Sequence, residues 1–405
     1  MISLIKNAFS GIPSQVWLLS GISLINRSGA MVICFLTLYL TENLHFTIQE
    51  AGFVMSSYGM GAIFGAFLGG KFTDRFGYRL VMLSTLIATG LVLLLAMNIR
   101  GFWPMCTTLF ILNCISEAFR PASSVSIRMN SNDEIRVRSF SLYRVFINLA
   151  VSLALIFGGI IIGFGWKWIF ICDALSCFFA AVLLLIYLPP EDKSRSNKVV
   201  TGNKEISFNT VAHKDTNFIW FLFFTFLGAV VFMQILWTIP PFFKQIYGWN
   251  ESKIGLVSAV NGTVVMLVEL PLIFLLDGKR KTMWMIRVGI LLYGVSYLLL
   301  IFPAEYILIW AIAYMVIISF GEIFVMPFSS TWVSFRSPDH NQGRYIAYYT
   351  MSYSIANVIA PWLGTQVVAH FGFNLLWFLM ALLSIIAFAG FWMVEHRILK
   401  ESTGY

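Results

Sequence analysis

Runs of about twenty apolar residues follow one another along almost the whole chain, each long enough to cross a bilayer as an α-helix. A hydropathy window of about that length separates twelve such runs. Their approximate limits are residues 15–40, 49–72, 80–98, 103–128, 139–162, 168–188, 217–240, 252–276, 283–302, 305–328, 344–367 and 374–394. Lipid offers the backbone no hydrogen-bond partner, so such segments must satisfy their own polar groups as helices. We predict an all-α polytopic membrane protein with twelve transmembrane helices.

The amino-acid composition agrees with a membrane protein. Of the 405 residues, 59% are hydrophobic and 11% are charged, against roughly 25% charged in soluble domains. The polar segment at residues 1–11 lacks the pattern of a cleavable signal, so the first span is expected to remain in place. The five cysteines all lie within apolar runs, without the spacing of a metal site or a disulfide framework. We therefore expect neither a metal nor a cofactor.

One long hydrophilic segment, residues 189–216, interrupts the apolar pattern, with six spans before it and six after it. Its charged residues include Glu191, Asp192, Lys193, Arg195, Lys198, Lys204, Glu205 and Lys214. We expect an N-terminal six-helix bundle at residues 1–188, a cytoplasmic linker at 189–216 and a C-terminal six-helix bundle at 217–405.

The lysines and arginines indicate the orientation of the spans. Most of the 27 lie near the chain ends, in the linker or at the other even-numbered connections. The opposite side of the membrane would hold Arg100, Lys167, Lys244 and Lys253. By the positive-inside rule both termini are expected in the cytoplasm, as in a multi-pass protein of a bacterial inner membrane. This distribution also accounts for the net charge of +8, so nucleic-acid binding is not expected.

The two halves of the chain echo each other at a spacing of about 205 residues. Gly52 and Asp74 flank the second span as Gly255 and Asp277 flank the eighth. The fourth span carries Glu-x-Phe-x-Pro-x-Ser-Ser from residue 117, and the tenth carries Glu-x-Phe-x-x-Pro-x-Ser-Ser from residue 322. This ordered correspondence predicts two pseudo-symmetric bundles of the same orientation.

A dense group of charges and glycines, Gly70–Arg79, separates the second and third spans, and we predict a tight charged turn there. Its pattern, G-x-x-x-D-R-x-G-x-R, resembles the loop between helices 2 and 3 of the major facilitator superfamily of transporters. The segment Gly321–Pro327 and the start of span 11 at Arg344-Tyr345 are similar to the same family. The resemblance implies two six-helix halves that rock about a site near the membrane midplane. It also implies a monomer.

The resemblance implies that the Gly70–Arg79 segment acts as a conformational gate. In the family the loop aspartate, here Asp74, bonds to a helix end of the other half, while neighbours such as Arg75 and Arg79 pair locally. A solvated turn is the alternative. The gate residues that we expect, including an echo in the second half, are Gly70, Asp74, Arg75, Gly77, Arg79 and Asp277.

Two finer resemblances bear on the class of transporter. The run Arg144-x-x-x-Asn148, followed by Gly158-Gly159, is similar to span 5 of bacterial drug:proton antiporters, although the Gly-Pro pair of that family is Ile156-Phe157 here. Span 1 resembles that of proton-coupled peptide symporters, which carry an E-x-x-E-R motif there. This chain has Ser23 and Asn26 at the positions of the two glutamates.

Ionisable residues at bilayer depth cost about 2.5–3.5 kcal/mol on insertion scales, so each is a functional hypothesis. The candidates for proton coupling or substrate contact are Arg27, Glu117, Arg120, Glu269 and Glu322. Glu117 and Arg120 are three residues apart on one helix face and can pair. Such a group is either a structural ion pair or a carboxylate that exchanges between an arginine and a proton.

The remaining polar residues of the spans offer weaker hypotheses. Glu322 follows Gly321, which allows close helix approach, and suits a proton carrier, a contact to a cationic substrate or a structural hydrogen bond. Asp173, near the end of span 6, is expected to cap a helix or to contact an interface. The cavity-lining candidates are Asn26, Tyr39, Tyr58, Gln234, Trp237, Asn261, Tyr314, Tyr349 and Tyr353. Aromatic rings with a few amides suit an amphipathic organic molecule.

The chain has no G-x-x-x-x-G-K-[ST] nucleotide signature and no set of residues typical of an enzyme. An ion gradient is therefore the expected energy source, and embedded carboxylates favour protons. We predict a proton-coupled secondary transporter that exports a small organic solute of drug or metabolite type. A proton-coupled importer of a small metabolite or peptide-like solute and an uncoupled facilitator are the alternatives.

Overall fold

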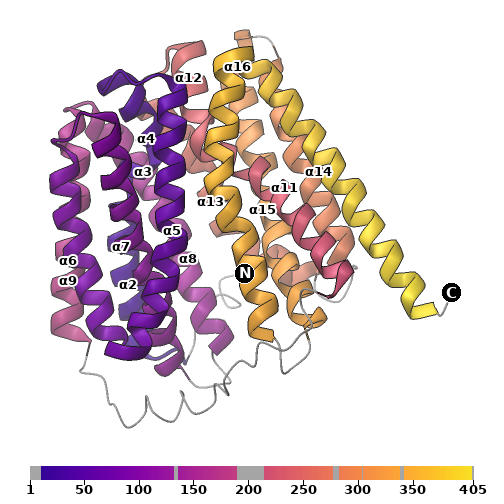
Figure 1. Ribbon diagram of the computed structural model, residues 1–405, viewed down its shortest axis with the longest axis horizontal. Coiled ribbons are helices and arrows are strands. Elements are labelled where there is room, and N and C mark those ends of the chain that lie inside the picture. Colours follow the sequence, from indigo (N-terminus) through magenta and orange to yellow (C-terminus); the bar gives the residue numbers. More distant parts are fainter. Residues whose placement is uncertain are drawn as a thin grey trace. The chain divides into compact units, whose positions relative to one another are not determined.

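The computed structural model describes residues 11–131, 136–188, 214–276, 282–302, 304–337 and 342–403 (Figure 1). Helices make up the secondary structure of these residues, and ten helical segments among them are long and apolar enough to cross a membrane. The all-helical fold is thus confirmed, whereas the number of twelve spans stays a prediction.

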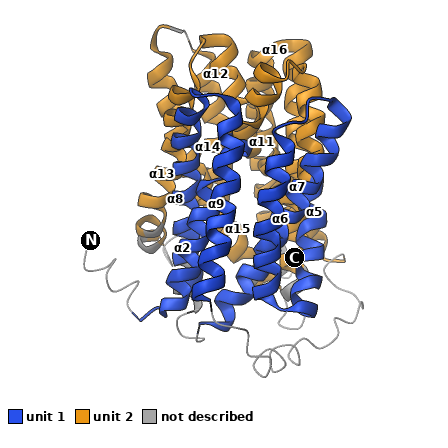
Figure 2. Cartoon of the chain, turned by 90° about the vertical axis from the view of Figure 1, so that its left-hand side faces the viewer, with its two compact units in different colours: residues 1–34, 60–209 blue, residues 35–59, 210–405 orange. Residues whose placement is uncertain are grey.

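The chain divides into two compact units (Figure 2). Unit 1 comprises Met1–Cys34 and Met60–Asn209, and unit 2 comprises Phe35–Gly59 and Thr210–Tyr405. The helices of unit 1 are α2 (Ser14–Ser28), α3 (Met31–Cys34), α6 (Tyr78–Ala96), α7 (Phe102–Met129), α8 (Arg136–Ile162) and α9 (Trp166–Tyr187). Residues 35–59 pack with unit 2, so the units do not follow the chain in one cut. The expected domains at 1–188 and 217–405 stay a prediction.

Unit 2 contains most of the remaining helices. They are α4 (Leu36–Leu38), the π-helix η1 (Tyr39–Asn43), α11 (Thr216–Trp237), α12 (Ile239–Tyr247), α13 (Glu251–Leu276), α14 (Thr282–Leu298), the 3-10 helices η2 (Leu299–Ile301) and η3 (Ala304–Tyr306), α15 (Ile307–Arg336) and α16 (Gln342–Thr403). Helix α5 (Ile48–Phe76) begins in unit 2 and ends in unit 1.

Aliphatic side chains from α2, α6, α7 and α9 build a core in unit 1. Leu19, Met82, Ala122 and Leu184 are all fully buried there. Glycines allow α5 to approach α7 closely, since a Cβ at Gly65 would overlap the backbone of Cys114. This close approach packs α5 directly against the middle of α7.

Aromatic rings build much of the core of unit 2. The Tyr297 ring stacks on Trp377 at a centroid distance of 5.3 Å, and Phe242 meets Trp377 edge-on at 5.2 Å. The Tyr297 hydroxyl donates to the carbonyl of Val231 at 2.8 Å, so the buried phenol is satisfied. These contacts join α11, α12, α14 and α16.

Equivalent helices pack on one another in the two units, as the internal repeat predicts. In unit 1, α2 packs on α8, and α6 packs on α7 and α9; in unit 2, α11 and α14 both pack on α16, and α14 packs on α15. Helix α16 takes the place of spans 11 and 12, since two helices meet within it at Gly372, whose φ is 79°. The part before Gly372 meets α11 at Gly364, and the part after it meets α14 at Ser384.

The first span is not the single helix expected at residues 15–40. Helix α2 ends at Ser28, a turn at Gly29–Ala30 follows, and α3, α4 and the π-helix η1 carry the chain to Asn43. Hydropathy gives the length of a span but not the continuity of its hydrogen bonds. A broken helix can cross a membrane where protein groups satisfy the freed backbone.

The charged turn predicted at Gly70–Arg79 is wrong in its extent. Helix α5 continues to Phe76 and α6 begins at Tyr78, so Gly77 alone makes the turn. Its φ of 86° favours glycine, whereas Gly70 lies within the helix with open space where a Cβ would be. Charges at a helix end were mistaken for a loop, because exposed last turns tolerate polar residues as readily as loops do.

Candidate functional site

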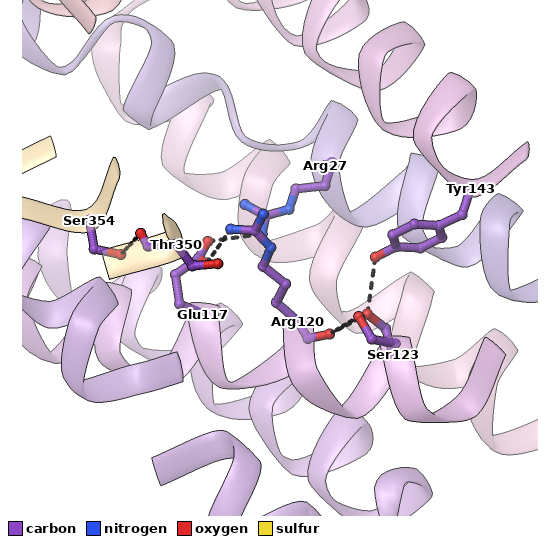
Figure 3. Close-up of polar contacts among 8 residues, drawn as sticks. Arg27, Glu117, Arg120, Ser123, Tyr143, Thr350 and Ser354 are labelled. Atoms are coloured by element: carbon purple, nitrogen blue, oxygen red, sulfur yellow. Dashed lines mark hydrogen bonds and ion pairs between the residues drawn. The ribbon is translucent and has the colours of Figure 1, made fainter. Parts of the chain in front are cut away.

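Three charged side chains of unit 1, those of Arg27, Glu117 and Arg120, lie close together (Figure 3). Arg27 Nη2 of α2 donates to Glu117 Oε1 of α7 at 2.9 Å. Arg120 Nη1, one turn further along α7, lies 3.8 Å from Glu117 Oε2. The structure therefore brings together the three residues of the first half that the sequence indicated.

The two arginines do not contribute equally to this group. Side-chain exposure is 27% for Arg27 and 15% for Glu117, but 69% for Arg120. Screened ion pairs of exposed groups contribute little, whereas breaking a buried pair leaves an uncompensated charge. The Arg27–Glu117 hydrogen bond is therefore the stronger interaction, and Arg120 is a looser second cation.

Local features of α7 fix this part of the site. Pro121 lacks an N–H, which frees the main-chain carbonyl of Glu117 four residues earlier. The hydroxyls of Ser123 and Ser124 donate to the carbonyl of Arg120 at 2.9 and 3.0 Å. Ser123 also hydrogen-bonds the Tyr143 hydroxyl of α8 at 3.0 Å (Figure 3). Pro121 and the two serine hydroxyls thus alter the pattern of backbone hydrogen bonding in the turn of α7 directly after Glu117.

A second carboxylate group lies in unit 2, at the equivalent position of the repeat. The Asn261 amide of α13 donates to Glu322 Oε2 at 3.1 Å and to Ser319 Oγ at 3.0 Å. On another side of α15, Gly321 permits close packing on α14, since a Cβ there would lie 2.7 Å from the Tyr293 ring. Ser319 was missed, although it precedes Glu322 by three residues and therefore shares its helix face.

Two tyrosines of α16 belong to the same unit. Tyr349 and Tyr353 meet edge-to-face with ring centroids 5.3 Å apart, and the Tyr349 hydroxyl contacts the carbonyl of Met326 on α15 at 3.4 Å. The Tyr293 ring of α14 packs beside Gly321, the residue before Glu322. Unit 2 thus surrounds a carboxylate with an amide, a hydroxyl and aromatic rings.

Other candidate residues are packed in the interior of unit 2. Gln234 donates to the carbonyl of Ala360 at 2.9 Å and is fully buried, as are Trp237, Tyr39 and Tyr314. Tyr58 meets the Trp237 ring edge-on at 6.5 Å. Burial and these contacts make the five residues part of the packing of unit 2 in this conformation, and their role as cavity lining stays a prediction.

Asn26 and Glu269 lie in different environments. Asn26 is half-buried on α2, where its Oδ1 accepts from Cys177 Sγ at 3.5 Å. Glu269 is 7% exposed on α13, two residues before Pro271. Glu269 is therefore buried among protein groups, and its role in proton coupling or substrate contact stays a prediction.

A comparison with known protein families identifies the superfamily of this chain. The family model of the major facilitator superfamily matches residues 16–361 and 284–403. The chain belongs to the major facilitator superfamily. It is a multi-pass membrane protein and a secondary transporter, and its relatives are transporters rather than enzymes.

Two relatives match over almost their whole length. One is a Na(+), Li(+), K(+)/H(+) antiporter of Planococcus maritimus, 25% identical over 403 residues, which cover 91% of this chain and 93% of the relative. The other is the uncharacterized MFS-type transporter YhjO of Bacillus subtilis strain 168, 22% identical over 388 residues and 93% of both chains.

Solved structures share the superfamily fold. The nucleoside transporter NupG superposes with a TM-score of 0.78 at 16% identity, covering 94% of this chain and 99% of NupG. A POT family transporter in complex with 5-aminolevulinic acid gives 0.77 at 15% identity, covering 94% of this chain and 96% of that transporter. These likenesses concern the fold alone.

The residues of the first half that are predicted to form a gate lie at the junction of α5 and α6. Asp74 and Arg75 are exposed, and the Arg75 guanidinium lies 5.3 Å from the Phe76 ring centroid. Arg79 Nη2 donates to the carbonyl of Leu185 on α9 at 3.0 Å, within unit 1. Asp277 lies outside the described residues, so the gate as a whole stays a prediction.

Asp215 and Arg336 form a polar cluster in unit 2 that sequence reasoning missed. Asp215 caps α11 by accepting from Phe218 N at 3.1 Å and receives Arg336 Nε and Nη2, both at 2.9 Å. The Tyr345 hydroxyl donates to it at 3.2 Å. Burial acts to raise the pKa of Asp215, but the Arg336 and Phe218 hydrogen bonds outweigh it and hold the pKa below its usual value. An aspartate directly before an apolar run was the signal for this cap.

Proposed function

We propose that this protein is a proton-coupled antiporter that exports a small organic solute by alternating access. The observation that carries the proposal is the Arg27–Glu117–Arg120 group, a carboxylate held between two guanidinium groups inside an apolar bundle. Ionisable residues at membrane depth are costly and typically mark proton or substrate pathways. The carboxylate is the natural proton carrier, because arginine stays charged at every relevant pH.

Exchange at Glu117 provides the coupling. While Arg27 contacts Glu117, the ionised carboxylate is favoured and the proton is absent. When helix movement separates the two groups, the buried carboxylate takes up a proton and becomes neutral. Renewed pairing with Arg27 releases that proton on the other side of the membrane. Arg120, more exposed, accompanies Glu117 through the cycle as a secondary cation.

The Glu322 group suits contact with the solute. It combines a carboxylate with the amide of Asn261, the hydroxyl of Ser319 and the rings of Tyr349 and Tyr353. Such a set favours an amphipathic organic cation, since aromatic faces and a carboxylate both attract positive charge. In this proposal unit 1 carries the proton and unit 2 recognises the solute.

The orientation belongs to the same proposal. The distribution of lysine and arginine favours both termini in the cytoplasm of a bacterial cell, with the protein in the inner membrane. The junction of α5 and α6 would then face the cytoplasm, where Asp74 and its neighbours act as the gate. The expected functional form is a monomer.

Flux measurements in proteoliposomes test this function. Purified protein is reconstituted, and uptake of a panel of dyes, antibiotics and amino acids is followed with and without an imposed pH gradient. Export coupled to protons predicts accumulation only when the gradient drives antiport, and collapse on addition of a protonophore. Equal rates with and without the gradient for every transported solute would instead identify an uncoupled facilitator, and accumulation with the opposite gradient an importer.

Exchange of monovalent cations for protons is the second candidate function. The Planococcus maritimus relative, a Na(+), Li(+), K(+)/H(+) antiporter, favours it. The same liposomes, loaded with a pH-sensitive dye, distinguish the two functions. Proton movement on addition of Na⁺, Li⁺ or K⁺ without any organic solute would support cation exchange, and its absence, with solute-driven proton movement, would support solute export.

A further inference from the structure

The break in the first span redirects two backbone hydrogen bonds. In a continuous α-helix, the N–H groups of Met31 and Val32 would donate to the carbonyls four residues earlier. At this break the carbonyl of Arg27 accepts instead from Ala30 N at 3.1 Å. The break thus begins in the same turn of helix that carries the Arg27 side chain.

Asp173 of α9 receives both redirected N–H groups. Met31 N donates to its Oδ1 at 3.1 Å, and Val32 N donates to its Oδ2 at 2.9 Å. The side chain is 2% exposed. Both oxygens of the carboxylate are therefore used on two successive backbone donors, a pairing that an asparagine cannot reproduce, because one of its two terminal atoms is itself a donor. The expected capping role of Asp173 is confirmed.

The same turn of α9 presses against the break. A Cβ at Gly29 would overlap the hydroxyl of Ser176 and lie 3.4 Å from the Cα of Asp173. One turn later, Cys177 Sγ contacts Asn26 Oδ1 at 3.5 Å. Helix α9 therefore holds the end of α2 on both sides of Arg27 along the chain.

We infer that Asp173 is a positioning residue for the Arg27–Glu117 pair, because it fixes the point at which α2 ends. With the break in place, the last turn of α2 directs Arg27 to Glu117 at 2.9 Å. If the N–H groups of Met31 and Val32 returned to the carbonyls of α2, the end of α2 and the Arg27 side chain would move together. The functional meaning of this inference rests on the proposed proton exchange at Glu117, but the positioning itself does not.

A double-mutant cycle in detergent tests the positioning without any transport measurement. Unfolding temperatures are compared for Arg27→Gln, Glu117→Gln and the double variant, in the wild-type background and in Asp173→Asn. In the wild-type background the two changes should be strongly non-additive, because each removes the same contact. In Asp173→Asn they should become additive. Non-additivity that persists unchanged there would overturn the inference.

Thr85→Val is the matched control, since Thr85 is a buried polar residue of unit 1 whose hydroxyl donates within α6 to the carbonyls of Val81 and Met82. It should lower the unfolding temperature without changing the Arg27–Glu117 coupling. A control that abolishes the coupling as Asp173→Asn does would show that general loosening of the bundle is the cause, and would overturn the inference equally.

A second pair of variants covers the case in which Asp173→Asn does not fold. Gly29→Ala places a methyl group against Ser176 and should displace the break, whereas Gly29→Ala with Ser176→Gly removes the obstacle. The first should lose the Arg27–Glu117 coupling and shift the pH profile of flux, and the second should restore both. Loss without restoration would count against positioning by α9. A wild-type protein whose flux ignores pH would overturn the proposed function, while the coupling cycle would still decide the role of Asp173.

Discussion

The two units place a glutamate at equivalent points of the repeat but surround it differently. In unit 1, Glu117 is held by the guanidinium groups of Arg27 and Arg120. In unit 2, Glu322 accepts from the amide of Asn261, beside Ser319 and tyrosine rings. A guanidinium group keeps a carboxylate ionised, whereas an amide can serve either protonation state. The proposed division of tasks, with the proton in unit 1 and the solute in unit 2, rests on this difference in surroundings.

We expect the largest change in proton-coupled transport from Glu117→Gln. The neutral amide keeps the size of the side chain but can neither bind a proton nor balance the charge of Arg27. We expect accumulation driven by a pH gradient to fall to the level of protein-free liposomes, while exchange of solute across the membrane without a gradient stays measurable.

The matched control for that experiment is Glu305→Gln, which neutralises an exposed glutamate of η3. It should leave both activities unchanged. If gradient-driven accumulation persisted in Glu117→Gln, the proton could not be carried by Glu117. That result would contradict the assignment of proton coupling to unit 1 and solute recognition to unit 2.

Glu322→Gln should act on recognition instead of coupling. Loss of the negative charge should raise KM for cationic solutes about tenfold, equivalent to about 1.4 kcal/mol, with little change for neutral ones. Asn261→Ala should act in the same direction more weakly, since the carboxylate remains. KM and the dependence on the pH gradient are measured on the same liposomes. An unchanged KM together with lost coupling would place the proton at Glu322 and reverse the two assignments.

The sequence predicts which residues belong to the two sites better than it predicts the contacts between them. Glu117 and Arg120 lie three residues apart in an apolar run, so their pairing follows from helix geometry alone. Asn261 and Glu322 are each predicted to be functional, but their hydrogen bond joins α13 and α15, which lie 61 residues apart in the sequence, and no local pattern predicts that contact. The superfamily itself was identified from the Gly70–Arg79 motif and confirmed, although most of that motif is helical.

The break in the first span shows the limit of such patterns. Residues 15–40 are apolar enough for one continuous helix, and Gly29 alone does not end a helix in a membrane segment. The break depends on a carboxylate from α9 that accepts backbone N–H groups, and backbone donors leave no mark in a sequence. Asp173 could be predicted to bond a helix end, but the identity of that helix came from the fold.

Asp215 is a third carboxylate, and its hydrogen bonds connect helix ends of unit 2. Its four donors, from Arg336, Phe218 and Tyr345, join α11, α15 and α16. Asp215→Asn should lower the free energy of unfolding by about 1–3 kcal/mol, the usual cost of losing a charge-assisted hydrogen bond. Thermal unfolding in detergent measures the change.

The difference in the free energy of unfolding between wild type and Asp215→Asn should depend on pH in one direction. Because the folded protein holds the pKa of Asp215 below its usual value of 3.8, its stabilising contribution is complete above that value. It is lost as the pH falls through the lower folded pKa. The gap between wild type and Asp215→Asn should therefore be constant from pH 7 to about pH 5 and shrink below about pH 4. A gap that widens in acid would contradict the assigned role of Arg336.

Arg120→Gln should have the smallest effect on proton coupling. It thereby distinguishes the contribution of Arg120 from that of Arg27. Arg120 is 69% exposed and 3.8 Å from Glu117, so screening leaves its attraction at most about 1 kcal/mol, or about fivefold in the coupling equilibrium. Arg27→Gln, which removes the 2.9 Å contact, should abolish coupling as Glu117→Gln does. Flux against pH for the two variants, at low and high salt, distinguishes them, since only the exposed cation should lose its influence in high salt. Equal losses from both changes would mean that Glu117 needs two cations at once, and the exchange with a proton would then have to break both contacts in one step.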